Sequence, residues 1–189
     1  MAALSHFGID FGAKLAGTTA VCFANDGQLH LLQSAKKQDA DAWLRRLFAE
    51  QKPSAVFMDA PLSLPSVYKG LGSDFHYRAC DRAVGAMSPM FLGGLTARAM
   101  QLRAAFTAIP FYEIYPAELV RTLFPANFFY KKDLSSFLAQ MKEKLPLPFA
   151  EPPENWHQVD ATLAWWTGWR YGRGEAVCFG EEAEGVIWV

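Results

Sequence analysis

Three β-prone, largely apolar runs follow one another at the start of the chain, separated by short polar segments. They cover residues 6–12, 17–24 and 28–33. Between the last two runs stands Asn25-Asp26-Gly27, a strong signal for a tight hairpin turn. The pattern therefore predicts a three-stranded antiparallel meander over the first 34 residues.

An amphipathic helix and a buried strand are predicted next. Residues 39–51 show the apolar stripe of a surface helix that Asp39 or Asp41 caps and Pro53 ends. Residues 54–58 are apolar and β-prone, which indicates one buried strand. A meander, a helix and a strand in this order favour an α/β fold whose fourth strand is parallel to one of the first three.

The rest of the chain predicts further helices and strands. Residues 66–108 are mostly helical in pattern, with a helix from about Thr96 to Phe106 and no strand signal. Asn155 is expected to cap a late helix, with Gln158 closing a capping box. The other predicted elements are an aromatic strand at 110–116, a helix at 116–124, an amphipathic segment from Phe128 to Lys144, and a terminal hairpin from 176–180 and 186–189.

Size and composition favour one globular domain. The chain has 189 residues, 51% of them hydrophobic, which is enough for a buried core. We expect a single domain over residues 1–189 with a helical insertion at about 66–108. The net charge of −1 gives no overall basic field, so contact with nucleic acid requires a local basic patch.

The sequence carries no signal for a membrane or for secretion. No stretch reaches the ~18–20 apolar residues of a membrane helix, and the start of the chain lacks a signal-peptide pattern. The three cysteines are scattered and the four histidines show no close ligand spacing, which argues against disulfides and structural zinc. We therefore expect a cytoplasmic protein without a membrane partner.

Asp59 is the first candidate for chemistry. It follows the predicted strand at 54–58, and Pro61 and Pro65 prevent both a helix and a longer strand. Open α/β sheets bind ligands in the crevice beyond the carboxyl ends of their strands, where Asp59 is expected to lie. The alternative is a turn or cap aspartate whose oxygens accept backbone N–H bonds.

Three further acids stand in apolar surroundings like those of Asp59. Asp10 lies in the first predicted strand, Glu113 in the aromatic strand and Asp160 near the start of the late helix. Asp10 has an alternative role as a cap for the turn at Gly12. If the strands are neighbours, the carboxylates meet at one end of the sheet and repel one another unless a cation binds.

A hard divalent cation suits such a cluster. Mg²⁺ and Mn²⁺ prefer oxygen ligands, and paired ions activate water and stabilise the leaving oxygen in phosphodiester cleavage. A second candidate feature is the Arg78, Asp81 and Arg82 stretch, which is either part of a solvated helix face or a positive patch for phosphate.

Several of these stretches together resemble one family. They are Gly8-Ile9-Asp10, residues 59–65 (Asp-Ala-Pro-Leu-Ser-Leu-Pro), Arg78-x-Cys80-Asp81-Arg82, Glu113-x-Tyr115-Pro116 and Asp160-Ala161. In this combination, which spans nearly the whole chain, the sequence resembles the domain of unknown function 429 family. The resemblance implies a ribonuclease H-like α/β fold, in which three antiparallel strands and a helix precede further strands parallel to the first. Helices flank this mixed central sheet, one of them near the end of the chain.

The same resemblance implies a metal-dependent nuclease site. Asp10, Asp59 and Asp160 correspond to the catalytic, metal-binding acids of the first strand, the fourth strand and the late helix. Glu113 corresponds to a supporting ligand or a structural residue. Ribonuclease H enzymes usually hold a glutamate on the first helix, whereas the only one here, Glu50, falls at its far end. Asp81 and Glu113 are the alternatives for its place.

Three functions stay open from the sequence. The leading one is a nuclease or phosphodiesterase dependent on Mg²⁺ or Mn²⁺, with a nucleic acid or a small phosphoester as substrate and Arg78, Asp81 and Arg82 as substrate-binding residues. The second is a non-catalytic binding or scaffold protein on the same fold. The third is a nucleotide-binding module like those of actin and sugar kinases, suggested by residues 8–12 and Gly17-Thr18-Thr19. Those proteins need a second lobe, for which this chain is short.

Overall fold

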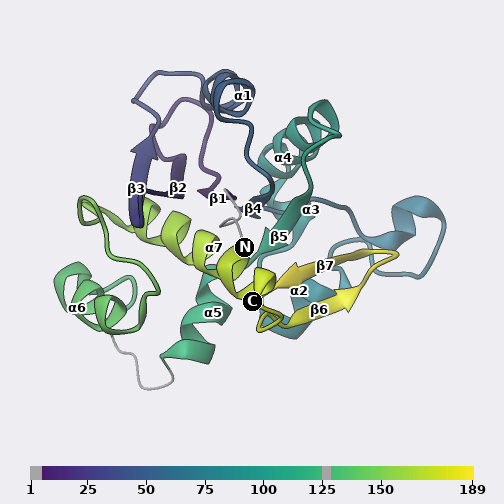
Figure 1. Cartoon of the computed structure of the whole chain (residues 1–189). Coiled ribbons are helices and arrows are strands. Elements are labelled where there is room, and N and C mark those ends of the chain that lie inside the picture. The colour runs from purple at the N-terminus through teal and green to yellow at the C-terminus, as the bar shows by residue number, and fades with distance from the viewer. Residues whose placement is uncertain (1–5, 125–128) are drawn as a thin grey trace.

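Seven strands of the described residues form one mixed sheet (Figure 1). The structure is a computed structural model that describes residues 6–124 and 129–189. The order across the sheet is β3-β2-β1-β4-β5-β7-β6. The strands are β1 (Phe7–Asp10), β2 (Ala20–Asn25), β3 (Gln28–Gln33), β4 (Val56–Asp59), β5 (Phe111–Ile114), β6 (Cys178–Glu181) and β7 (Gly185–Trp188).

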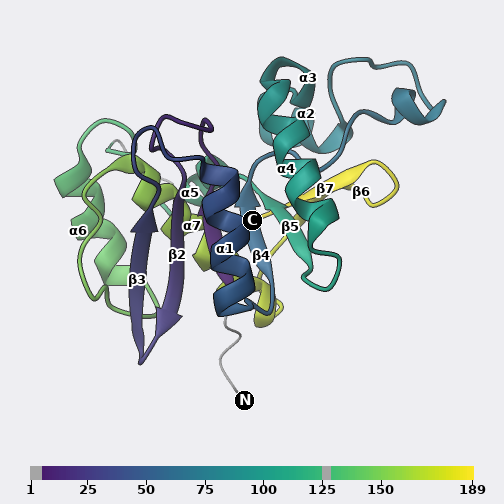
Figure 2. The same ribbon diagram turned by 90° about the horizontal axis from the view of Figure 1, so that it is seen from above.

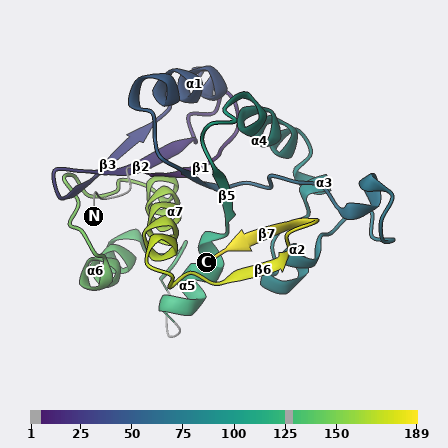
Figure 3. The ribbon, with the colours of Figure 1, turned by 45° about the vertical axis from the view of Figure 1, so that its right-hand side comes forward.

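Helices cover both faces of the sheet. Figure 3 shows α1 and α4 on one side and α7, with α6 and α5, on the other. The two hydrophobic cores match these layers, because one joins Leu44 of α1 and Leu102 of α4 to Ile9, and the other joins Leu163 of α7 to Cys22. The helices are α1 (Ala40–Gln51), the 3-10 helix η1 (Ser66–Lys69), α2 (Ala79–Val84), α3 (Pro89–Leu92), α4 (Gly94–Ala105), α5 (Pro116–Leu123), α6 (Leu134–Lys144) and α7 (Trp156–Gly172).

The predicted meander is confirmed. β1 pairs with β2 and β2 with β3, both antiparallel. Asp26 and Gly27 in the connecting turn have φ values of 47° and 74°, as a two-residue hairpin turn with the correct twist requires. β4 then pairs with β1 in parallel, so the predicted parallel fourth strand is confirmed. This order of strands and directions is the one expected for a ribonuclease H-like fold.

Helix α7 packs very closely against the centre of the sheet because β1 carries a glycine there. A Cβ atom added to Gly8 would lie 2.0 Å from the backbone nitrogen of Trp165 and 2.4 Å from the carbonyl oxygen of Ala161. No residue with a side chain fits in that gap without moving the helix. The close contact sets how near α7 comes to the carboxyl ends of β1 and β4.

The segment between β4 and β5 is helical and contains no strand, as predicted. It holds η1, α2, α3 and α4, and Figure 2 shows the stretch between β4 and α2 extending away from the sheet. The helix predicted from about Thr96 is α4 and begins two residues earlier, at Gly94. None of the helices in the described ranges is long and apolar enough to cross a membrane.

Two local predictions need correction. Within the predicted amphipathic segment, helix α6 covers only Leu134–Lys144, because Asp133 caps it through the backbone N–H of Ser136. Phe128 lies outside the described residues. The capping box at α7 does not form as predicted: Asn155 accepts N–H bonds from His157 and Gln158, but the Gln158 side chain accepts from Glu154 N rather than from the cap residue.

Candidate metal centre

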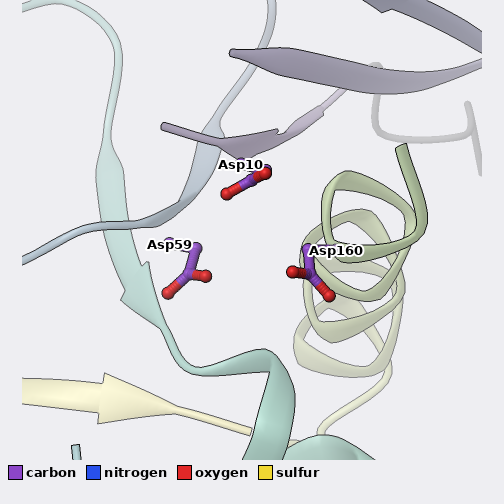
Figure 4. Close-up of side chains that lie close together, drawn as sticks. All are labelled: Asp10, Asp59 and Asp160. Atoms are coloured by element: carbon purple, nitrogen blue, oxygen red, sulfur yellow. The ribbon is translucent and has the colours of Figure 1, made fainter. Parts of the chain in front are cut away.

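Three of the predicted acids meet at the carboxyl edge of the sheet. Asp10 ends β1, Asp59 ends β4, and Asp160 lies in the second turn of α7. One carboxylate oxygen of each lies within 4.8 Å of one from each of the others. Figure 4 shows the three side chains directed toward a common space. The expected convergence of these distant acids is therefore present in the structure.

The register of the two parallel strands explains why Asp10 and Asp59 share one face. They are direct partners across β1 and β4, so their side chains leave the sheet on the same side. Ile9 and Met58, the residues before them, point into the core under α1 and α4. Alternation along each strand then directs both aspartates toward α7. The same alternation excludes Asp10 as the cap of the turn at Gly12, whose N–H is bonded by Thr19 Oγ1.

The three carboxylates strongly perturb one another. Desolvation raises the pKa of Asp59 well above its usual value, and the charges of Asp10 and Asp160 add to that shift. Burial raises the pKa of Asp160 to about 6, although the nearby Lys131 ammonium opposes the shift. Three acids at this separation are therefore costly to ionise together unless positive charge is supplied.

Three polar residues that the sequence prediction missed lie directly against the acids. His157 Nδ1 is 2.7 Å from Asp10 Oδ2, and this hydrogen bond raises the pKa of the imidazole. Lys131 forms an ion pair with Asp160, whose other carboxylate oxygen accepts a 2.8 Å hydrogen bond from the Tyr130 hydroxyl. The site thus contains an imidazole, an ammonium and a phenol beside three carboxylates.

Only one of these neighbours has a signal in the sequence. His157 precedes Asp160 by three residues on the same helix, a spacing that puts both on one face. Lys131 lies just before α6, in a turn where its own φ is left-handed, at 61°. Its ion pair with Asp160 joins residues 29 positions apart in the chain, and residue spacing does not encode such a contact.

The donor set fits a hard divalent cation. All three members of the cluster offer carboxylate oxygen, the ligand that Mg²⁺ and Mn²⁺ prefer, and no thiolate takes part. A divalent ion also removes the repulsion that raises the pKa of Asp59 and Asp160. Asp10, Asp59 and Asp160 are therefore the residues that would hold it.

Glu113 and Asp81 are not part of this cluster but of a buried ionic network around Arg78. The guanidinium donates through Nε and Nη2 to Asp81, through Nη1 and Nη2 to Glu113, and through Nη1 to Ser63 Oγ. All five N–H donors of the side chain are thereby used. Arg78 is fully buried, and its pKa is raised because the two carboxylates outweigh the effect of burial.

This network fastens the helical insertion to the sheet. Arg78 is the N-cap residue of α2 and Asp81 lies in that helix, whereas Glu113 lies in β5. The backbone N–H of Leu62, in the loop after β4, donates a 2.9 Å hydrogen bond to Glu113 Oε2. An arginine whose donors are all satisfied inside the protein has none left for a phosphate. The structure thus places Arg78 and Asp81 in a structural role rather than in the expected substrate contact.

Arg82 and Arg98 are also engaged within the protein. Arg82 is exposed, lies over the ring of Tyr77 and pairs with Asp74. Arg98 pairs with Asp41 and donates to the carbonyl oxygen of Gly12. The hairpin considered for nucleotide binding uses its own backbone donors as well, since the N–H groups of Gly12 and Ala13 bond to threonine hydroxyls.

The sheet order and the acid cluster together define an α/β protein with a ribonuclease H-like strand arrangement and a candidate divalent-cation site. Among solved structures, the chain is similar to Thermus thermophilus RuvC, at 16% identity and a TM-score of 0.48, covering 90% of this chain and 96% of that one. It is also similar to T. thermophilus RuvC in complex with a Holliday junction substrate, at 17% identity and a TM-score of 0.45, covering 89% and 94%. No protein-family model and no curated protein matches the chain. At these identities and TM-scores, the similarity does not support any assignment of fold or function. The fold assignment therefore rests on the sheet topology, and the candidate site rests on its own geometry.

Proposed function

We propose that the protein is a nuclease or phosphodiesterase of the ribonuclease H-like superfamily that depends on Mg²⁺ or Mn²⁺. The observation that carries this proposal is the approach of Asp10, Asp59 and Asp160 to within 4.8 Å at the carboxyl edge of the sheet. Membership of the domain of unknown function 429 family belongs to the same proposal and rests on the motifs alone, all five of which contribute residues to the acid cluster or to the Arg78 network.

The chemistry divides between the acids and their neighbours. Bound divalent cations at such a site supply water activation and stabilisation of the leaving oxygen. The carboxylates of Asp10, Asp59 and Asp160 supply the negative charge that would bind these cations. The Tyr130 hydroxyl orients the Asp160 carboxylate through its hydrogen bond. The His157 side chain is 41% exposed and its Nδ1 is hydrogen-bonded to Asp10, so the imidazole is placed to exchange a proton with water.

Lysines at the same edge of the sheet suit a polyanionic substrate. β3 runs parallel to β1, and Gln33, Ala20 and Asp10 lie in one row across the three strands. The loops after β1 and β3 touch each other through the bond from Lys37 N to the carbonyl oxygen of Leu15. The exposed lysines of these loops are Lys14, which pairs with Asp39, and Lys36 and Lys37, which add local positive charge at this edge of the sheet despite the net charge of −1.

The test combines metal binding with cleavage. We expect calorimetry to detect Mn²⁺ binding to the wild-type protein, and labelled DNA and RNA oligonucleotides to be cut only when the metal is present. Asp59→Asn removes a ligand and should lower both metal affinity and cleavage at least a hundredfold. It should fold at least as stably as wild type without metal, because one of three mutually repelling charges is gone.

Asp26→Asn is the matched control, since it makes the same change in an exposed turn where asparagine tolerates the left-handed backbone. It should behave as wild type does. Equal cleavage by the wild type and by Asp59→Asn would remove the proposal, and so would the absence of Mn²⁺ binding at millimolar concentration.

A further inference from the structure

A cavity of about 260 Å³ opens directly beside the acid cluster. Asp10 and Asp59 form part of its wall, so anything bound at these acids has the cavity as its immediate neighbour. The volume lies just below the ~300–1,000 Å³ of pockets that enclose drug-sized ligands. A space of this size suits a single planar ring system.

The helical insertion supplies much of the cavity wall. Ala86 and Met87 from the turn after α2, Leu92 at the end of α3 and Leu95 in α4 all line it. Ile114 and Tyr115 close the other side, at the end of β5. These side chains are apolar or aromatic. Contact with such side chains offsets the stacking energy that a base gives up when it leaves its neighbours in the strand.

The charges around the cavity disfavour a phosphate group as its occupant. Its described lining contains no lysine or arginine and includes the carboxylates of Asp10 and Asp59, whereas the lining carboxylates of Asp81 and Glu113 are paired with the buried Arg78. An anion would be repelled from such a wall, whereas a neutral ring is not. Carboxylates also accept hydrogen bonds from ring and amino N–H groups.

We propose that this cavity receives one unpaired nucleobase adjacent to the phosphodiester that the acid cluster binds. The inference rests on the proposed function, because the acids position the backbone that carries the base. Extruding a base from an intact duplex costs unpairing and unstacking energy, which an already unpaired base does not require. The preferred substrate class is therefore single-stranded nucleic acid or a site where a base is left without a partner.

The first test compares substrates and needs no protein variant. Binding of the Mn²⁺-loaded protein is measured by anisotropy with a short single-stranded oligonucleotide and with a set in which each position in turn is abasic. We expect one abasic position, next to the bond that is cut, to weaken binding about tenfold (about 1.4 kcal/mol). The matching full duplex should bind more weakly than the intact single strand. Equal binding of every abasic oligonucleotide would overturn the inference.

The second test fills the cavity. Ala86→Phe puts a ring into the space, and Val177→Phe adds the same ring at an exposed position outside the cavity. Ala86→Phe should bind the intact oligonucleotide about tenfold more weakly and the critical abasic one as wild type does. Val177→Phe should leave both unchanged. If Ala86→Phe weakened binding of both oligonucleotides equally, or of neither, the cavity would not be specific for a base.

The two proposals fail in different ways. If cleavage depends on the metal but not on the base beside the cut, the nuclease proposal stands and the proposal of a base-binding cavity is wrong. Base-dependent binding without cleavage of any oligonucleotide overturns the nuclease and supports the cavity.

Discussion

Asp160 combines burial with two polar neighbours. The Tyr130 hydroxyl and the Lys131 ammonium both reach its carboxylate. Burial raises the pKa of Asp160 to about 6, and the charge of Lys131 opposes that rise. The residue therefore depends on a neighbouring cation, either Lys131 or a bound metal ion, to stay ionised near neutral pH.

Replacing Lys131 tests that dependence. In Lys131→Met the pKa of Asp160 should rise above about 6, because the opposing positive charge is lost while burial remains. Carboxyl-detected NMR titration of the metal-free protein measures the shift. Lys132→Met is the matched control, since this neighbouring lysine is exposed and it is Lys131, not Lys132, that pairs with Asp160. A pKa of Asp160 equal in both variants would contradict the assigned ion pair.

Arg78 allows a second prediction at the scale of one side chain. Arg78→Met leaves the buried carboxylates of Asp81 and Glu113 without their partner and should destabilise the fold by about 3–5 kcal/mol. Urea denaturation followed by circular dichroism measures the loss. Arg82→Met, four residues further along α2, removes an exposed pair and should be indistinguishable from wild type. A small effect of Arg78→Met would show that the network does not hold the insertion.

At the scale of elements, the site depends on the contact between β1 and α7. Gly8 lets the helix approach closely enough for Asp160 to reach the acids that end β1 and β4. Gly8→Ala should destabilise the protein by about 1–3 kcal/mol through overpacking and should weaken Mn²⁺ binding, because α7 must move. Gly94→Ala has open space around its Cβ and is the control expected to leave both quantities unchanged. Thermal unfolding and calorimetry measure the two effects.

The elements were more predictable from the sequence than the contacts between them. The meander, α1 and α7 follow from local turn, cap and apolar patterns, and the parallel β4 follows from connection rules. The acids could be singled out from the sequence because a carboxylate buried in an apolar strand is costly unless it is paired or binds a metal ion. The burial of Arg78 was not predictable, since its partner Glu113 is 35 residues away and an R-x-x-D helix start looks the same when it is exposed.

At the scale of the whole molecule, the acids couple stability to pH. Unfolded aspartate has a pKa of about 3.9, and folding raises the pKa of Asp160 to about 6 and also raises the pKa of Asp59 well above its usual value. A raised carboxyl pKa adds stability that is complete below the unfolded value and is lost as the pH rises through the folded value. The metal-free protein should therefore lose stability between about pH 4 and pH 6 on account of Asp160.

Metal should reverse that loss. We expect the increase in melting temperature on adding Mn²⁺ to be larger at pH 8 than at pH 5, because the ligands must be deprotonated to bind. Differential scanning fluorimetry at the two pH values, with and without Mn²⁺, measures it. Asp160→Asn should flatten the pH dependence of the metal-free protein. A metal-induced shift that is the same at both pH values would contradict the linkage.

The order in which the ligands occur along the chain has a consequence for synthesis on the ribosome. Asp10 and Asp59 emerge early, whereas Asp160 and the helix that carries it, α7, follow only after β5, α5 and α6 have been made. A nascent polypeptide released before α7 therefore lacks one wall of the proposed metal centre, and any hydrolytic activity would be delayed until this helix has been synthesised.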